Sequence, residues 1–165
     1  MLFDSVLQDW QLILPQTGTY TLTVDGNSAS SVGLYSFRLL EVLAPQQFTI
    51  SFGDTISNGV PAPGAGNLEV PGAVDIYTFD ALAGQDAVFD WLSGSNVLIG
   101  WRLEAPDSAE LFDSALQDWH LILPQTGTYT LTVKGTGIDD FGTYSFALLE
   151  DEANTWYIHL ALVMR

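Results

Sequence analysis

The sequence predicts an all-β fold, an antiparallel β-sandwich with a jelly-roll-like arrangement. Apolar and polar residues alternate with a period of two in most apolar segments, as they do in strands that bury one face. Turn sequences rich in Gly, Pro, Asn and Asp separate these segments at intervals of roughly eight to twelve residues, which is typical of sandwiches and barrels. No segment has a convincing helical period. Together these observations favour short strands packed as two sheets.

The expected strands before residue 70 fall into two groups. Three strands are predicted near the start of the chain, centred on Trp10, Tyr20 and Phe37. The next strand covers residues 48–52, in which three apolar residues alternate with polar ones before a Gly-Asp turn. Residues 58–68 are rich in Gly and Pro and are predicted to form a connection rather than a strand.

Six further strands are predicted after residue 70. They cover residues 75–79, 87–91, 97–103, 119–123, 128–133 and 144–148. In residues 128–133 threonines alternate with apolar residues, which indicates an antiparallel sheet with one buried face and one face in water. Turn sequences such as Pro124-Gln125-Thr126-Gly127 end these strands.

A long internal repeat divides the chain. Residues 2–41 (the first repeat copy) recur without a gap as residues 111–150 (the second repeat copy), with 29 identities in 40 positions. A period of 109 residues fits one whole small domain, so the repeat predicts part of a tandem array. We expect residues 1–43 to be the C-terminal half of a preceding unit and residues 46–150 to be a complete unit. Residues 151–165 would be a tail or the start of a further unit.

The two repeat copies would compete for the same partner strands in residues 46–104. We expect the second repeat copy to win, because an array would use that pairing. The first repeat copy would then expose its inward-facing apolar residues, namely Trp10, Leu12, Leu14, Tyr20, Leu22, Tyr35 and Phe37. Exposed apolar faces and strand edges promote domain swapping and aggregation, so the chain by itself is predicted to swap or to behave poorly.

The charge of the chain excludes several classes of partner. The chain has four Lys and Arg residues and twenty Asp and Glu residues, so its net charge is −16. Such a chain cannot neutralise the phosphates of nucleic acid, and it is repelled by anionic membrane surfaces. The most apolar run, residues 156–164, is too short to span a bilayer. The acidity keeps an array soluble, suits a salty medium, or supplies carboxylates for a divalent cation.

The sequence offers no convincing catalytic group. It has no cysteine, and therefore no thiolate nucleophile or thiolate metal site. The adjacent carboxylates Asp139 and Asp140 lie in a predicted loop whose first-copy equivalent is Ser30-Ser31, which favours a solvated loop over an acid–base pair. His120 is predicted on an outward strand face, and His159 lies in the tail. We therefore expect that the protein is not an enzyme.

Three tryptophans are candidates for a ligand platform. Trp91, Trp101 and Trp119 would stack on sugar rings, with Asp90 and Asp118 accepting hydrogen bonds from hydroxyl groups, if they lay together on an exposed sheet face. Each tryptophan is nevertheless in phase with the buried residues of its own strand, which favours a place in the core. A carbohydrate-binding module is therefore kept as an alternative function, which depends on whether these three rings are accessible.

Several motifs follow one another along the chain, at residues 48–50 with 53–54, 75–79 with 83–84, 103–107, 121–131 and 142–146. Their order resembles that of the bacterial pre-peptidase C-terminal domain, a β-sandwich module of secreted proteins. The resemblance implies a non-catalytic module, and some members bind calcium or a polymer such as collagen. In calcium-binding members the ligands come from an acidic linker and from carboxylates near the Asp-x-Tyr-x-Phe strand. Here Asp75 is retained, whereas Gly72 and the linker of residues 44–47 depart from that pattern.

The resemblance and the carboxylates together define a candidate cation site and a function. The candidate metal ligands are Asp75, Asp54, Asp139 and Asp140, and calcium is the only cofactor considered. The predicted function is that of a non-catalytic repeat module of a secreted or cell-surface bacterial protein, acting as a spacer, an adhesion unit or a substrate-targeting unit. Its partners would be neighbouring units of the same chain and an extracellular polymer or protein. A calcium-stabilised module is a further alternative.

Overall fold

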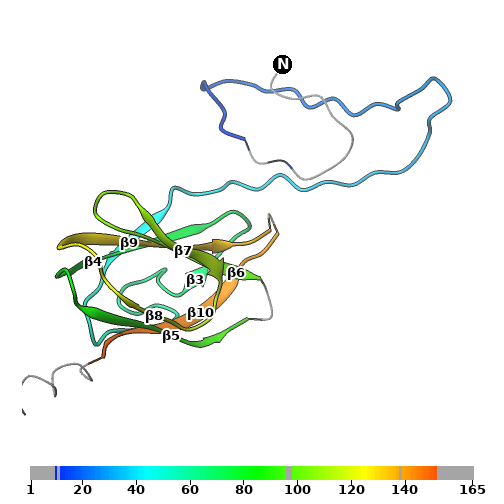
Figure 1. Ribbon diagram of the computed structural model, residues 1–165. Helices are drawn as coiled ribbons and strands as arrows, with labels where there is room; N and C mark the ends of the chain where they lie inside the picture. The colour runs from blue at the N-terminus through cyan, green and yellow to red at the C-terminus, as the bar shows by residue number, and fades with distance from the viewer. Residues whose placement is uncertain (1–9, 11, 96–97, 138, 152–165) are drawn as a thin grey trace, which may run out of the picture. The chain divides into compact units, whose positions relative to one another are not determined.

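The computed structural model describes residues 10, 12–95, 98–137 and 139–151 (Figure 1). The chain divides into two compact units, Met1–Glu41 and Val42–Arg165. All strands of the described residues lie in the second unit, between Gln46 and Glu150. The tail or further unit expected at residues 151–165, with His159, lies outside the described residues apart from Asp151. No helix in the described part of the chain is long and apolar enough to cross a membrane.

The second unit is a sandwich of two sheets, as the sequence predicts. Its strands are β1 (Gln46–Thr49), β2 (Thr55–Ile56), β3 (Asn67–Leu68), β4 (Val74–Ala81), β5 (Asp86–Gly94), β6 (Ile99–Glu104), β7 (Glu110–Ala115), β8 (Trp119–Ile122), β9 (Gly127–Gly135) and β10 (Gly142–Glu150). One sheet has the order β1-β4-β9-β6-β7. The other has the order β2-β10-β5-β8, and β3 also pairs with β10.

The central strand pairs join distant parts of the sequence. β4 pairs with β9 from Val74↔Lys134 to Ala81↔Gly127, and β10 pairs with β5 from Tyr144↔Gly94 to Glu150↔Ala87. Both pairs are antiparallel, whereas β1 runs parallel to β4. The second repeat copy supplies β7 to β10 and so contributes to both sheets. The unit therefore needs residues 46–104 and 111–150 together.

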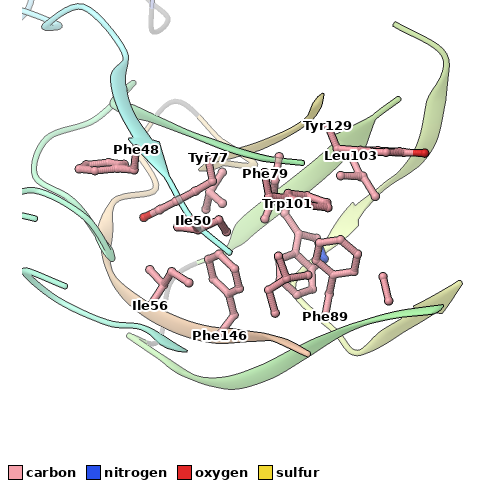
Figure 2. Packing of buried hydrophobic residues seen from close by; sticks show 14 of the residues in the cluster. Phe48, Ile50, Ile56, Tyr77, Phe79, Phe89, Trp101, Leu103, Tyr129 and Phe146 are labelled. Carbon is pink, nitrogen blue, oxygen red and sulfur yellow. The ribbon is translucent and has the colours of Figure 1, made fainter. Parts of the chain in front are cut away.

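The core is filled by the inward-facing residues of the two sheets (Figure 2). Alternation along β4 buries Tyr77 and Phe79, and alternation along β6 buries Trp101 and Leu103. Aromatic rings make edge-to-face contacts across the sandwich, for example Phe146 with Trp101, whose ring centroids are 5.6 Å apart. A core of this kind leaves the exposed side chains and the two ends of the sandwich as places for function.

Sequence periodicity located most strands of the second unit. The expected strands at residues 48–52, 75–79, 87–91, 119–123, 128–133 and 144–148 correspond to β1, β4, β5, β8, β9 and β10, and that at 97–103 corresponds to β6, with Val97 outside the described residues. The sequence missed β2, β3 and β7. β2 and β3 have two residues each, and β7 has one fully buried residue, Phe112.

The strands expected around Trp10, Tyr20 and Phe37 were predicted wrongly. Residues 10 and 12–45 contain no strand. Strands of a sheet persist only with hydrogen-bonded neighbours, and the second repeat copy occupies the places beside β4, β5 and β6. Many apolar residues in the described part of the first unit are correspondingly exposed, among them Trp10, Leu12, Leu14, Tyr20, Leu22, Tyr35 and Phe37.

Candidate functional site

A buried carboxylate, Asp75, lies at the end of the sandwich where β1, β3 and β10 meet. Asp75 is fully buried in β4, and its Oδ2 accepts a hydrogen bond from the Tyr144 hydroxyl group. The Tyr144 hydroxyl lies 2.7 Å from that of Tyr77, which accepts from the Gly66 amide at 2.9 Å. The Gly66 amide can only donate, so the Tyr77 hydroxyl accepts from it and donates to the Tyr144 hydroxyl. The Tyr144 hydroxyl in turn donates to the Asp75 carboxylate. The chain of donors ends on the carboxylate.

The environment of Asp75 favours its protonated form. Burial removes water from the carboxylate and raises its pKa from 3.8 to about 6, against the opposing effect of the Tyr144 hydrogen bond. The negative charge of Glu69 raises the pKa further. Among the described residues, Oδ1 has no hydrogen-bond partner. Burial also raises the pKa values of Tyr77 and Tyr144, so both hydroxyl groups stay protonated and remain donors.

Gly66 gives this network its geometry. Its φ is +69°, a left-handed conformation that disfavours other residues. A Cβ atom there would lie 2.3 Å from the carbonyl carbon of Ser57. The Gly66 carbonyl also accepts a hydrogen bond from the Tyr144 amide at 3.0 Å. The Gly-rich connection between β2 and β3 therefore brings backbone close to the ends of β4 and β10.

The four aspartates predicted to bind a cation are used in separate places. Asp54 closes the turn after β1 by accepting from the Ser51 amide at 2.8 Å. Asp140 closes the loop between β9 and β10 by accepting from the Gly137 amide at 2.7 Å, and Asp139 is its neighbour in that loop. Asp75 is buried in the network above. Within the described residues, these aspartates do not form a group that could share one metal ion.

The three candidate tryptophans do not form an exposed platform. Trp101 is 1% exposed and lies among Phe89, Phe112 and Phe146. Trp119 stacks on Phe112 at 4.8 Å, and Trp91 is partly buried against the core. Asp118, considered as a hydroxyl acceptor, accepts from the Trp91 amide at 2.9 Å. The strand phase therefore predicted the inward orientation correctly, and a sugar platform of these three rings does not fit the fold.

A different group of potential metal ligands lies at the opposite end of β10. Asp86 at the start of β5, His120 in β8 and Asp151 after β10 place ligand atoms within 4.8 Å of one another. His120 Nε2 is 2.6 Å from Asp86 Oδ1 and 3.7 Å from Asp151 Oδ2. An imidazole with two carboxylates suits a divalent transition metal such as zinc better than calcium. Sequence reasoning placed His120 on an outward face but missed the group.

The pairing of β5 with β8 brings Asp86 and His120 together, and this pairing could not be seen in the sequence. Val88 pairs with His120 and Asp86 pairs with Ile122, so Asp86 and His120 are diagonal neighbours on the outer face. Asp151 is held beside Asp86 because its amide donates a hydrogen bond to the Asp86 carbonyl at 3.2 Å. The three residues are far apart in sequence, and only the strand register brings them together.

A shallow polar depression is lined by residues from the end of β5, the start of β10 and the turn after β2. Its volume is about 380 Å³, and hydroxyl and amide groups dominate its lining: Ser57, Asn58, Ser93, Gly94, Ser95, Thr143, Tyr144 and Ser145. The hydroxyl groups of Ser93 and Ser145 lie 2.8 Å apart, so one of them donates a hydrogen bond to the other. The lining has no titratable residue apart from Tyr144, so it offers hydrogen bonds rather than acid–base chemistry.

Comparison with known proteins finds structural likeness only. No protein-family model matches the sequence, and no curated protein matches it significantly. A solved structure similar to this chain is PliG of Aeromonas hydrophila, a periplasmic lysozyme inhibitor of g-type lysozyme, with 16% identity, a TM-score of 0.44 and coverage of 64% of this chain and 99% of that one. The pre-peptidase C-terminal domain of a Bacillus anthracis collagenase is similar with 17% identity, a TM-score of 0.48 and coverage of 64% and 97%. The latter is the kind of domain that the sequence motifs resemble.

Proposed function

We propose that the chain belongs to a non-catalytic repeat protein of the bacterial cell surface or exterior, in which each β-sandwich is a spacer, adhesion or targeting unit. The observation that carries this proposal is the 109-residue period, which repeats the inward-facing residues of one sandwich in a second copy. Repetition of a whole domain extends a molecule and multiplies weak contacts without any catalytic centre. The strong negative charge supports a soluble, self-repelling array.

The arrangement of polar groups supports a binding role over catalysis. The buried Asp75 network is closed off from solvent, and in the polar depression the hydroxyl groups of Ser93 and Ser145 are hydrogen-bonded to each other. Neither combines an accessible nucleophile with an oriented base, which acyl or glycosyl transfer would require. The exposed hydroxyl-rich depression is the surface that we assign to contact with an extracellular polymer.

The test is adsorption of the chain to insoluble collagen, chitin, cellulose and peptidoglycan, measured by depletion from solution. We expect depletion by at least one polymer, and less depletion with a Ser93→Ala/Ser145→Ala variant that removes the paired hydroxyl groups. The Ser114→Ala variant, changed in β7 away from the depression, serves as control. Adsorption that is equal for all three proteins would argue against the depression, and turnover of any polymer would contradict a non-catalytic role.

A cation-binding module is a second candidate, favoured by the geometry of Asp86, His120 and Asp151. Zinc would link β5, β8 and the end of β10 and would stabilise the folded unit. Thermal unfolding with zinc and with chelator tests this candidate, and His120→Gln is the matched control because Gln11 stands at this position in the first repeat copy. An equal response of both proteins to zinc would rule out this site.

A further inference from the structure

The first repeat copy retains the residues that the second repeat copy buries. Eight residues of the second copy between 121 and 150 are buried: Leu123, Tyr129, Leu131, Val133, Tyr144, Phe146, Ala147 and Leu148. Seven of their first-copy equivalents are identical, namely Leu14, Tyr20, Leu22, Val24, Tyr35, Phe37 and Leu39. Residues 12–41, named the donor segment below, therefore carry the inward face that β8 to β10 present to the core.

The same side chains have opposite environments in the two copies. Tyr35 and Phe37 are 59% and 60% exposed, whereas Tyr144 and Phe146 are 2% and 0% exposed. Leu39 is 92% exposed, and its equivalent Leu148 is buried. A segment that exposes several large apolar side chains together is typical of an interaction site.

Two turns of the donor segment already make hydrogen bonds of their counterparts in the second repeat copy. The Tyr20 hydroxyl accepts from the Gln16 amide at 3.1 Å and donates to the Gln16 carbonyl at 2.6 Å. Tyr129 and Gln125 make the same two bonds, at 3.0 and 2.7 Å. Likewise, the Ser31 amide bonds the Ser28 carbonyl as that of Asp140 bonds Gly137. The donor segment is locally prepared for the fold without its sheet.

The one buried position that differs can be accommodated. Ala147 corresponds to Arg38, and Ala147 lies in β10 between Thr55 of β2 and Asp90 of β5. This position faces away from Phe146 and Leu148, toward the outer side of the sheet. An arginine there can extend its guanidinium group to water and lies beside the Asp90 carboxylate.

The donor segment cannot reach the strands of its own chain. In the place of β10, Glu41 would stand at the position of Glu150, which pairs with Ala87. Gln46 lies at the other end of the sandwich, where it bonds Glu69 beside the Leu68–Gly142 pair. Eight residues of strand separate Gly142 from Glu150, about 26 Å. Residues 42–45 span at most about 17 Å from Glu41 to Gln46.

We propose that the donor segment completes the sandwich of another molecule of this chain, pairing with its β2 to β6 in the places of β8 to β10. Each molecule has two repeat copies and one set of β1 to β6. The donor segment therefore enters only a molecule whose own second repeat copy has left those places. Two molecules that have both lost their own pairing can exchange donor segments reciprocally and form a closed dimer.

The test uses substitutions at equivalent positions of the two copies. Phe146→Asp places a charge against Tyr77 and Trp101 and disables the second repeat copy. We expect this variant to keep its β-sheet circular dichroism and to become a dimer of twice 18.0 kDa by light scattering. Phe37→Asp should stay a folded monomer, and the double variant should lose both sheet and dimer.

Mixing provides a second measurement. Wild-type chain, whose donor segment is intact, should restore sheet structure to labelled chains of the Phe37→Asp/Phe146→Asp double variant, whereas the Phe37→Asp chain should not. The proposal is overturned if Phe146→Asp is as unfolded as the double variant, if it remains a folded monomer, or if the double variant dimerises to the same extent. The last result would assign the dimer to a different surface.

Discussion

At the scale of single residues, the carboxyl group of Asp75 is the feature with the largest predicted effect on pH dependence. Its pKa is 3.8 in ordinary surroundings and about 6 in the fold, where burial is the main cause. The folded state therefore binds this proton more tightly than the unfolded state does. Its contribution to stability is complete below pH 3.8 and is lost as the pH rises through 6.

We predict that Asp75→Asn is more stable than the wild type at pH 8. Asparagine can accept the Tyr144 hydrogen bond and carries no charge to desolvate. A shift of about two pKa units corresponds to about 3 kcal/mol as an upper limit. The difference in free energy of unfolding between the two proteins, measured by urea denaturation, should shrink from pH 8 to pH 4. Asp113→Asn, a change of an exposed aspartate in β7, should show no such trend; a trend of equal size would refute the assignment to burial.

Substitution of Gly66 tests whether the close approach of its backbone to that of Ser57 matters for stability. We predict that Gly66→Ala is destabilised by more than about 2 kcal/mol, because its Cβ would collide with Ser57 and its φ is positive. Gly84→Ala is the matched control, since Gly84 also has a positive φ, of +85°, and an added Cβ would meet no described atom within 4 Å. Chemical denaturation of both variants separates the collision from the backbone strain. Equal losses would mean that the approach of Ser57 is unimportant.

At the scale of elements, the turn that leads into β9, from Gln125 to Tyr129, forms the same hydrogen bonds in both repeat copies. It stabilises a sheet only in the second repeat copy. Tyr129 is buried and bonds both backbone groups of Gln125, whereas Tyr20 makes the same bonds while exposed. We predict that Tyr129→Phe lowers the free energy of unfolding by about 1–3 kcal/mol, because it leaves two partly buried backbone groups of Gln125 without a partner. Tyr20→Phe should leave the thermal midpoint unchanged. A similar shift for both would show that the first unit unfolds cooperatively with the second.

The strands that the sequence predicted and those that it missed differ in how much they bury. β4, β9 and β10 alternate over eight or nine residues, and each buries several large side chains, so the period of two is clear. β2 and β3 are too short to show a period, and β7 is an edge strand that pairs only with β6. The strands predicted around Trp10, Tyr20 and Phe37 have the same pattern as real ones, so pattern alone could not reveal that they lack a sheet.

At the scale of the whole molecule, the two units should differ in resistance to proteolysis. The four basic residues are Arg38, Arg102, Lys134 and Arg165; Arg38 is exposed and outside any strand, whereas Arg102 and Lys134 lie in β6 and β9. We predict that trypsin first cleaves after Arg38, because proteases require an extended backbone.

The fragment that begins at residue 39 should keep the thermal midpoint of the intact chain. Mass spectrometry of a time course identifies the first product, and differential scanning fluorimetry compares the midpoints. Cleavage after Arg102 or Lys134 at the same rate as after Arg38 would contradict the stability assigned to the second unit.

The candidate sites illustrate the same division between sequence and structure. The phase of each strand correctly placed Trp101 and Trp119 toward the core, because side chains alternate strictly between the faces of a strand. The group of Asp86, His120 and Asp151 escaped prediction, because it depends on which strands are neighbours and in which register. Register is set by the packing of the whole sandwich and has no local signature in the sequence.

The sequence by itself determined the all-β class, the positions of the long strands and the duplication, since these follow from local alternation, turn chemistry and identity between segments. Only the tertiary structure decided which of two nearly identical copies is folded. The second repeat copy pairs with β2 to β6, while residues 12–41 form turns without strands. The physical reason is that a turn forms from its own hydrogen bonds, whereas a strand is stable only beside its neighbours, and one set of neighbours accommodates one copy.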